Sequence, residues 1–123
     1  MESHFEQFSY GHASDSFAQK GFLYTKILVG EGKYLHLINT HLNASYYDKQ
    51  IENLSAQIDV RVKSLEIIRD YFQHVIDKTD MNSSQNFFML CGDLNIDSFS
   101  DNENLEMKGE KTPVLKSLFK SMI

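Results

Sequence analysis

Hydrophobic and polar residues follow different periods along this chain, and the changes of period predict its elements. A run rich in β-branched and aromatic residues over 22–29 is typical of a β-strand, and a similar run over 34–42 predicts a second strand. The glycine-containing residues 30–33 between the two runs predict a short turn. We therefore expect the two runs to pair as an antiparallel hairpin.

From Ile51 onwards the period becomes helical. Apolar residues recur every three or four positions as far as Ile76, and charged residues occupy the opposite face. This pattern predicts one long amphipathic helix that covers a sheet. The apolar positions are Ile51, Leu54, Ile58, Val62, Leu65, Ile68, Phe72, Val75 and Ile76.

The stretch Phe87–Asn95 carries the most chemical information. Five apolar residues followed closely by Gly92 predict a buried strand that reaches the end of its sheet. Asp93 and Asn95 would point the same way if the chain stays extended, because strand side chains alternate with a period of two. Cys91 is expected to be a small buried hydrophobic residue, and as the single cysteine it has no disulfide partner.

The order of these elements predicts an α/β (α+β) fold, in which a long helix covers one face of a mixed β-sheet. Residues 1–123 form a single domain, and we expect it to be incomplete, because strands this apolar are normally packed on both faces. A further helix is expected to begin at Thr112–Pro113. Residues 1–19, in which polar and aromatic residues are mixed, are expected to be a loop or the trailing end of a missing part, and the segments 43–50, 78–86 and 96–111 are expected to be polar connections.

Composition narrows the class of partner only a little. The net charge of −5 offers no general attraction to a polyphosphate, so nucleic acid is disfavoured. No apolar run approaches the length of about 20 residues that spans a bilayer, and the first residues do not resemble a signal peptide. The sequence does not specify a compartment.

Polar side chains with relevant chemistry stand where two predicted strands end. His41 closes the second strand, and Asp93 and Asn95 close the third, so the three converge if these strands are neighbours. Phosphodiester hydrolysis needs a metal, a carboxylate that holds the metal or activates water, and neutral donors to the phosphate. By spacing alone, Asp93 and Asn95 fit a structural turn equally well, and His41 fits a hydrogen-bonded histidine at a sheet edge better than a site.

Several motifs together resemble the endonuclease/exonuclease/phosphatase (deoxyribonuclease-I-like) superfamily. Lys20–Ile27, Asn39–Leu42, the helix that contains Arg61 and Leu65, and Gly92–Asn95 occur in its order and at its spacing. Within the superfamily the chain is most similar to the neutral sphingomyelinases. The distinguishing stretch is Asp15–Gly21, which resembles the Asp…Lys-Gly segment that those enzymes carry just before the hairpin.

The resemblance implies part of a sandwich fold and a Mg²⁺-dependent hydrolase that converts sphingomyelin to ceramide and phosphocholine. It implies that Asp93 activates water or binds the metal, with Asn95 as the second metal-site position and the holder of the scissile phosphate. His41 would stabilise developing charge or aid the leaving group. Asp15 and Lys20 would form a switch pair that helps to assemble the site.

The sequence also departs from the family. No glutamate in a strand-like context precedes Asp15, and no histidine follows Asn95, so the metal-binding Glu and the Asp-His pair of the superfamily are missing. Ser64 stands where the family often has Gln, and Arg61 is interpreted as a structural helix residue. We therefore expect this chain alone to be inactive.

Three hypotheses follow from the resemblance. The first is the central part of a sphingomyelin phosphodiesterase, acting on a phospholipid at a membrane surface. The second is a non-catalytic truncated relative that serves as a binding or structural module, for a lipid headgroup or a protein. The third is a nuclease or inositol-phosphate phosphatase of the same superfamily, acting on another phosphodiester or phosphate ester.

Overall fold

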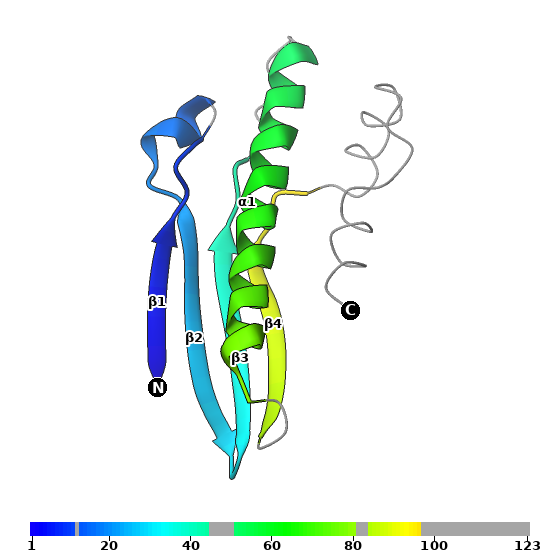
Figure 1. Ribbon diagram of the computed structural model, residues 1–123. Coiled ribbons are helices and arrows are strands. Elements are labelled where there is room, and N and C mark those ends of the chain that lie inside the picture. Colours follow the sequence, from blue (N-terminus) through cyan, green and yellow to red (C-terminus); the bar gives the residue numbers. More distant parts are fainter. Residues whose placement is uncertain (12, 45–50, 81–83, 97–123) are drawn as a thin grey trace.

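The computed structural model describes residues 1–11, 13–44, 51–80 and 84–96. These residues form a mixed four-stranded sheet with one long helix lying along one of its faces (Figure 1). The predicted α+β class is therefore confirmed, as are the hairpin and the helix. The elements are β1 Glu2–Gln7, the short 3-10 helix η1 Ala13–Phe17, β2 Gly21–Gly30, β3 Lys33–His41, α1 Ile51–Lys78 and β4 Gln85–Asp93.

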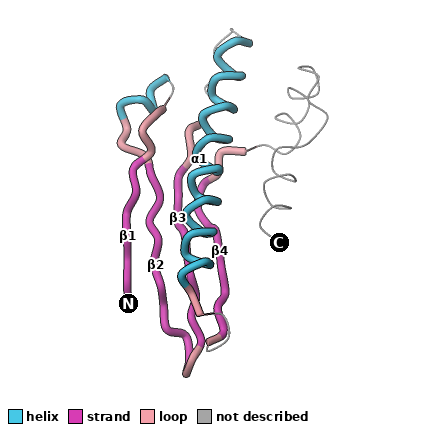
Figure 2. Tube along the Cα trace, viewed as in Figure 1, coloured by secondary structure: helices cyan, strands magenta, loops and turns pink. Residues whose placement is uncertain are grey.

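The sheet has the strand order β1-β2-β3-β4 (Figure 2). β2 pairs antiparallel with both β1 and β3, whereas β3 and β4 are parallel and are connected through α1. A parallel pair requires such a crossover connection, because its second strand must start at the same edge as its first. The ends of β3 and β4 and the start of β2 consequently lie at one edge of the sheet (Figure 1).

The prediction of a loop is wrong for Glu2–Gln7, which form β1, so the glutamates upstream of Asp15, Glu2 and Glu6, do lie in a strand. β1 pairs with β2 along its whole length, from Glu2 opposite Lys26 to Gln7 opposite Gly21. Phe5 is the single apolar residue of this strand, so the sequence shows no apolar alternation there. Backbone hydrogen bonds to β2 order this segment, which has little strand propensity of its own.

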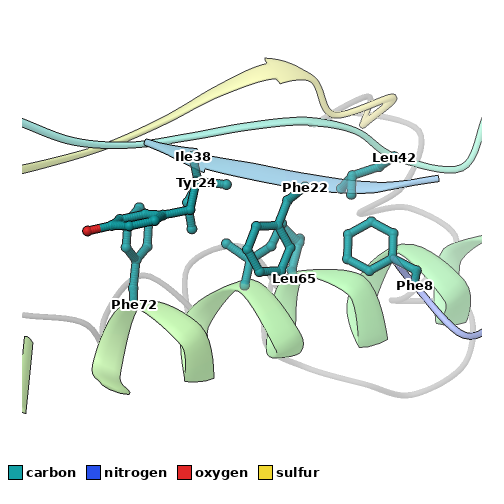
Figure 3. Packing of buried hydrophobic residues seen from close by; sticks show 8 residues of the cluster. Phe8, Phe22, Tyr24, Ile38, Leu42, Leu65 and Phe72 are labelled. Atoms are coloured by element: carbon teal, nitrogen blue, oxygen red, sulfur yellow. The ribbon is translucent and has the colours of Figure 1, made fainter. Parts of the chain in front are cut away.

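The hydrophobic core lies between α1 and the face of the sheet that α1 covers (Figure 3). Strand residues two apart, such as Phe22 and Tyr24, enter it from the sheet, and Leu65 and Phe72 enter it from the helix. The buried members are Phe8, Phe22, Tyr24, Ile38, Leu42, Leu65, Ile68 and Phe72.

A chain of polar side chains crosses this core. The Tyr24 hydroxyl donates to His36 Nδ1 at 2.8 Å, and His36 Nε2 donates to Asn86 Oδ1 at 2.9 Å. The Asn86 amide in turn donates to the Ser84 carbonyl at 3.1 Å, and this contact assigns its orientation and hence the tautomer of His36. Burial raises the pKa of Tyr24 to about 12, with smaller contributions from Glu2 and Tyr71.

The opposite face of the sheet remains open over the part of the chain that the structure describes. Phe87 and Met89 are 52% and 51% exposed, so the strand that was expected to be buried is covered on one face only. Cys91 is only partly buried, and its thiol lies 3.8 Å from Asn39 Oδ1. The expectation of a buried hydrophobic cysteine is therefore wrong.

Within the described ranges, no helix combines the length and apolar character that crossing a membrane requires. The predicted loop over 96–111 and the helix expected from Thr112–Pro113 lie outside the described residues, apart from residue 96.

Candidate active site

The parallel pairing of β3 with β4 brings His41 beside Asp93. The two residues are register partners at the ends of their strands, and His41 Nε2 lies 3.9 Å from Asp93 Oδ2. Each side chain is 63% exposed. The sheet edge thus presents an imidazole and a carboxylate together to solvent.

Asn95 also lies at this end of the sheet, but in a turn and not in an extended strand. β4 ends at Asp93, and the chain does not stay extended as far as Asn95, which has a left-handed backbone with φ of 50°. Its N–H donates to Asp93 Oδ1 at 2.9 Å, a side-chain turn that favours this conformation for Asn. The Asn95 side-chain amide then donates to the Leu42 carbonyl at 3.0 Å.

Gly92 allows β4 to lie close against β3 at the residue just before Asp93. Its φ is +122°, and a Cβ atom at this position would lie 1.8 Å from the Thr40 carbonyl oxygen. No other residue type has both the backbone freedom and the space that this approach requires. The close contact helps to hold Asp93 beside His41.

Asp15 and Lys20 form an ion pair beside the residues that follow β3. Lys20 Nζ lies 2.8 Å from Asp15 Oδ2, and the two side chains are only 10–15% exposed. Lys20 also donates to the Leu42 carbonyl at 2.8 Å, and Asp15 accepts from the Ala44 N–H at 2.7 Å. The pair thus contacts the residues that follow His41, and its role as a switch stays a prediction.

Two residues buried near this end of the sheet, Arg61 and Asn43, are not candidate site residues in the sequence analysis. Arg61 Nη1 donates to the Asn43 carbonyl at 3.2 Å, a contact that fits the interpretation of Arg61 as a structural helix residue. A usable signal was present, because Gln57, Arg61 and Ser64 place polar side chains at helical spacing within an apolar stripe. All three are 1–2% exposed.

Two side chains at this end of the sheet could contribute ligands to a divalent metal. Mg²⁺ is held by oxygen ligands, commonly one or two carboxylates together with waters and substrate phosphate oxygens. Asp93 and the Asn95 carboxamide oxygen are suitable donors, and the exposure of Asp93 leaves room for an ion. No group of three or more His, Cys, Asp or Glu among the described residues could complete such a site.

Comparisons with known proteins identify the relatives of this chain. No family model matches it. Sphingomyelinase C from Bacillus cereus is 26% identical over 115 residues, which are 94% of this chain and 31% of that protein. The crystal structure of SmcL superposes with a TM-score of 0.66 at 25% identity, over 87% of this chain and 35% of that one.

A beta toxin variant from Staphylococcus aureus, solved with bound magnesium ions, has a TM-score of 0.64 at 24% identity. The match covers 98% of this chain and 34% of the toxin. The chain thus spans about a third of the length of the proteins that it matches. The chain is thus similar in sequence to the sphingomyelinases C, and its sheet and helix match part of their endonuclease/exonuclease/phosphatase-type fold.

Proposed function

We propose that this chain forms one wall of the active site of a sphingomyelin phosphodiesterase, which releases phosphocholine and ceramide. The observation that carries the proposal is the 3.9 Å approach of His41 to Asp93 at the ends of two parallel strands. The likeness to sphingomyelinase C supports the choice of substrate. The ion pair of Asp15 with Lys20, next to the histidine strand, supports it further.

Each side chain has a part that its position allows. His41 is exposed and can donate to a phosphoryl oxygen or to the leaving oxygen as negative charge develops. Asn95 uses one N–H for the Leu42 carbonyl, and its second N–H is available to a phosphate oxygen. Asp93 would hold Mg²⁺ or orient the attacking water. When bound, Mg²⁺ would neutralise charge on the phosphoryl oxygens.

This wall alone is not expected to turn over substrate, because the superfamily supplies a metal-binding Glu and an Asp-His pair from elsewhere. We expect no phosphocholine release when the chain is assayed with sphingomyelin in mixed micelles and Mg²⁺. Release that is lost in Asp93→Asn would show that the chain is a complete catalyst, contrary to this proposal.

The binding of phosphocholine and Mg²⁺ tests directly whether these residues form one side of an active site. Phosphocholine and Mg²⁺ are titrated into the isotope-labelled chain, and amide shifts are followed by NMR. We expect saturable shifts at His41, Asp93 and Asn95 that are much weaker in Asp93→Asn. The matched control is Asp77→Asn, which removes an exposed helix carboxylate that accepts from Gln73. Shifts that are absent from the strand ends, or equal in both variants, would contradict the proposal.

A further inference from the structure

The backbone that follows His41 is held by side chains from several elements. We call Leu42–Ala44 the strand-end segment. The Leu42 carbonyl accepts from Lys20 at 2.8 Å and from Asn95 at 3.0 Å, and the Ala44 N–H donates to Asp15 at 2.7 Å. These contacts come from both flanks of the segment, from η1 and the start of β2 and from the turn after β4.

Arg61 approaches the same segment from α1. Its Nη1 donates to the Asn43 carbonyl at 3.2 Å, at the centre of the strand-end segment. Arg61 is the largest fully buried side chain among the described residues, at 2% exposure. A guanidinium stays charged at all relevant pH values, and burying it is costly unless its donors find partners. A residue placed here for packing alone would be apolar, as Leu65 is one turn later.

The strand-end segment is mechanically linked to the exposed pair. His41 precedes it directly, and the Leu42 N–H donates to the Asp93 backbone carbonyl at 2.9 Å. The His41 and Asp93 side chains are mostly in solvent, so the backbone behind them must set their separation. A shift of the Asn43 carbonyl would move Leu42, and with it the backbone hydrogen bond that links the end of β3 to the end of β4.

We propose that Arg61 is a positioning residue, which fixes the Asn43 carbonyl and thereby the separation of His41 and Asp93. Its catalytic meaning rests on the proposed function, whereas its effect on the strand ends does not. Asp15, Lys20 and Asn95 hold the flanks of the strand-end segment, and Arg61 holds its centre from the helix. α1 thus positions residues of the candidate site in addition to covering the hydrophobic core.

The experiment separates positioning from general stability by comparing amide hydrogen exchange in Arg61→Met and Arg61→Lys. In Arg61→Met we expect exchange at Leu42 and Ala44 to accelerate at least about tenfold more than at Ile38 in the middle of the sheet. This factor corresponds to the loss of one charge-assisted hydrogen bond. The His41 ring-proton resonances should move as well, and Arg61→Lys, which keeps a charged donor, should partly restore both signals.

Arg69→Met is the matched control, because Arg69 lies on the same helix but pairs on its surface with Asp70 at 2.7 Å. We expect it to leave the exchange at Leu42 and Ala44 unchanged. Equal acceleration throughout the sheet in Arg61→Met, or no acceleration, would overturn the proposal.

If Arg61→Met does not fold, Arg61→Lys carries the test by the same comparison of strand-end and mid-sheet amides. Selective loss of strand-end protection supports the proposal, and uniform or absent loss overturns it. Phosphocholine binding is measured separately on the native chain. Its failure would reject the proposed function without altering the exchange result.

Discussion

At the scale of residues, two ion pairs of similar length differ in their surroundings. Lys20 and Asp15 are 2.8 Å apart and 10–15% exposed, while Arg69 and Asp70 are 2.7 Å apart with side chains 34% and 68% exposed. Exposed pairs contribute little to stability, whereas removing one partner of a buried pair leaves an uncompensated charge. The distance between the two charges therefore says little about how much an ion pair contributes to stability.

Lys20→Met should lower the free energy of unfolding by about 3 kcal/mol, because it removes the cation that compensates the buried Asp15 carboxylate and one of the two side-chain donors to the Leu42 carbonyl. Arg69→Met should cost less than about 1 kcal/mol. Urea unfolding measures both variants. The single variant Asp15→Asn and the double variant Asp15→Asn/Lys20→Met complete a double-mutant cycle. The double variant should lose less stability than the sum of the losses in Asp15→Asn and Lys20→Met. Simple additivity would show that the pair is not coupled.

At the scale of elements, the interface between α1 and the sheet contains the polar chain of Tyr24, His36 and Asn86. Tyr24 has a pKa of about 12 in the folded chain, against 10 when unfolded. Between about pH 10 and about pH 12 the unfolded chain therefore binds fewer protons than the folded one. Stability that is fully present below pH 10 is lost as the pH rises through this window.

The urea midpoint should therefore fall as the pH is raised from about 10 to about 12. Tyr24→Phe should start lower, because His36 loses a donor, but its midpoint should fall less steeply over the same range. Some slope should remain, since burial also raises the pKa of Tyr10 and Tyr71. Parallel curves for the two proteins would assign the titration to groups other than Tyr24.

The elements differ in how well the sequence predicted them. The hairpin and α1 have clear local periods and were predicted within a few residues. β1 was missed because its side chains are mostly polar and its order comes from pairing with β2. The sequence predicts a candidate site at His41, Asp93 and Asn95, but the geometry of these residues depends on a non-local parallel pairing and on a left-handed turn. Neither leaves a periodic trace in the sequence.

At the scale of the whole molecule, the sheet has one packed and one open face. Phe72, on the packed side, is 2% exposed, whereas Phe87 and Met89 on the open side are about half exposed. Contiguous exposed apolar side chains of this kind bind apolar dyes and favour association. The two faces should therefore respond differently to the same kind of substitution.

Phe87→Ser/Met89→Ser should reduce the fluorescence of bound anilinonaphthalene sulfonate and lower self-association in sedimentation velocity. It should cost less stability per residue than a substitution in the core, because each of the two side chains is only about half buried. Phe72→Ala should instead cost about 3–5 kcal/mol through the cavity it leaves. A large loss of stability in the double serine variant would mean that the open face is packed in solution.

The parallel pairing of β3 with β4 also has a consequence for folding kinetics. The β2–β3 hairpin joins residues that are close in sequence, whereas the contact of Asn95 with Leu42 spans 53 positions. Pairing of distant segments carries the larger loop-closure entropy and is slower. We therefore expect His41 to be in place early, on the hairpin, and Asp93 to reach it only when α1 has packed and β4 has docked. The appearance of the His41–Asp93 pair should follow the rate of complete folding, so this contact reports when the chain has finished folding.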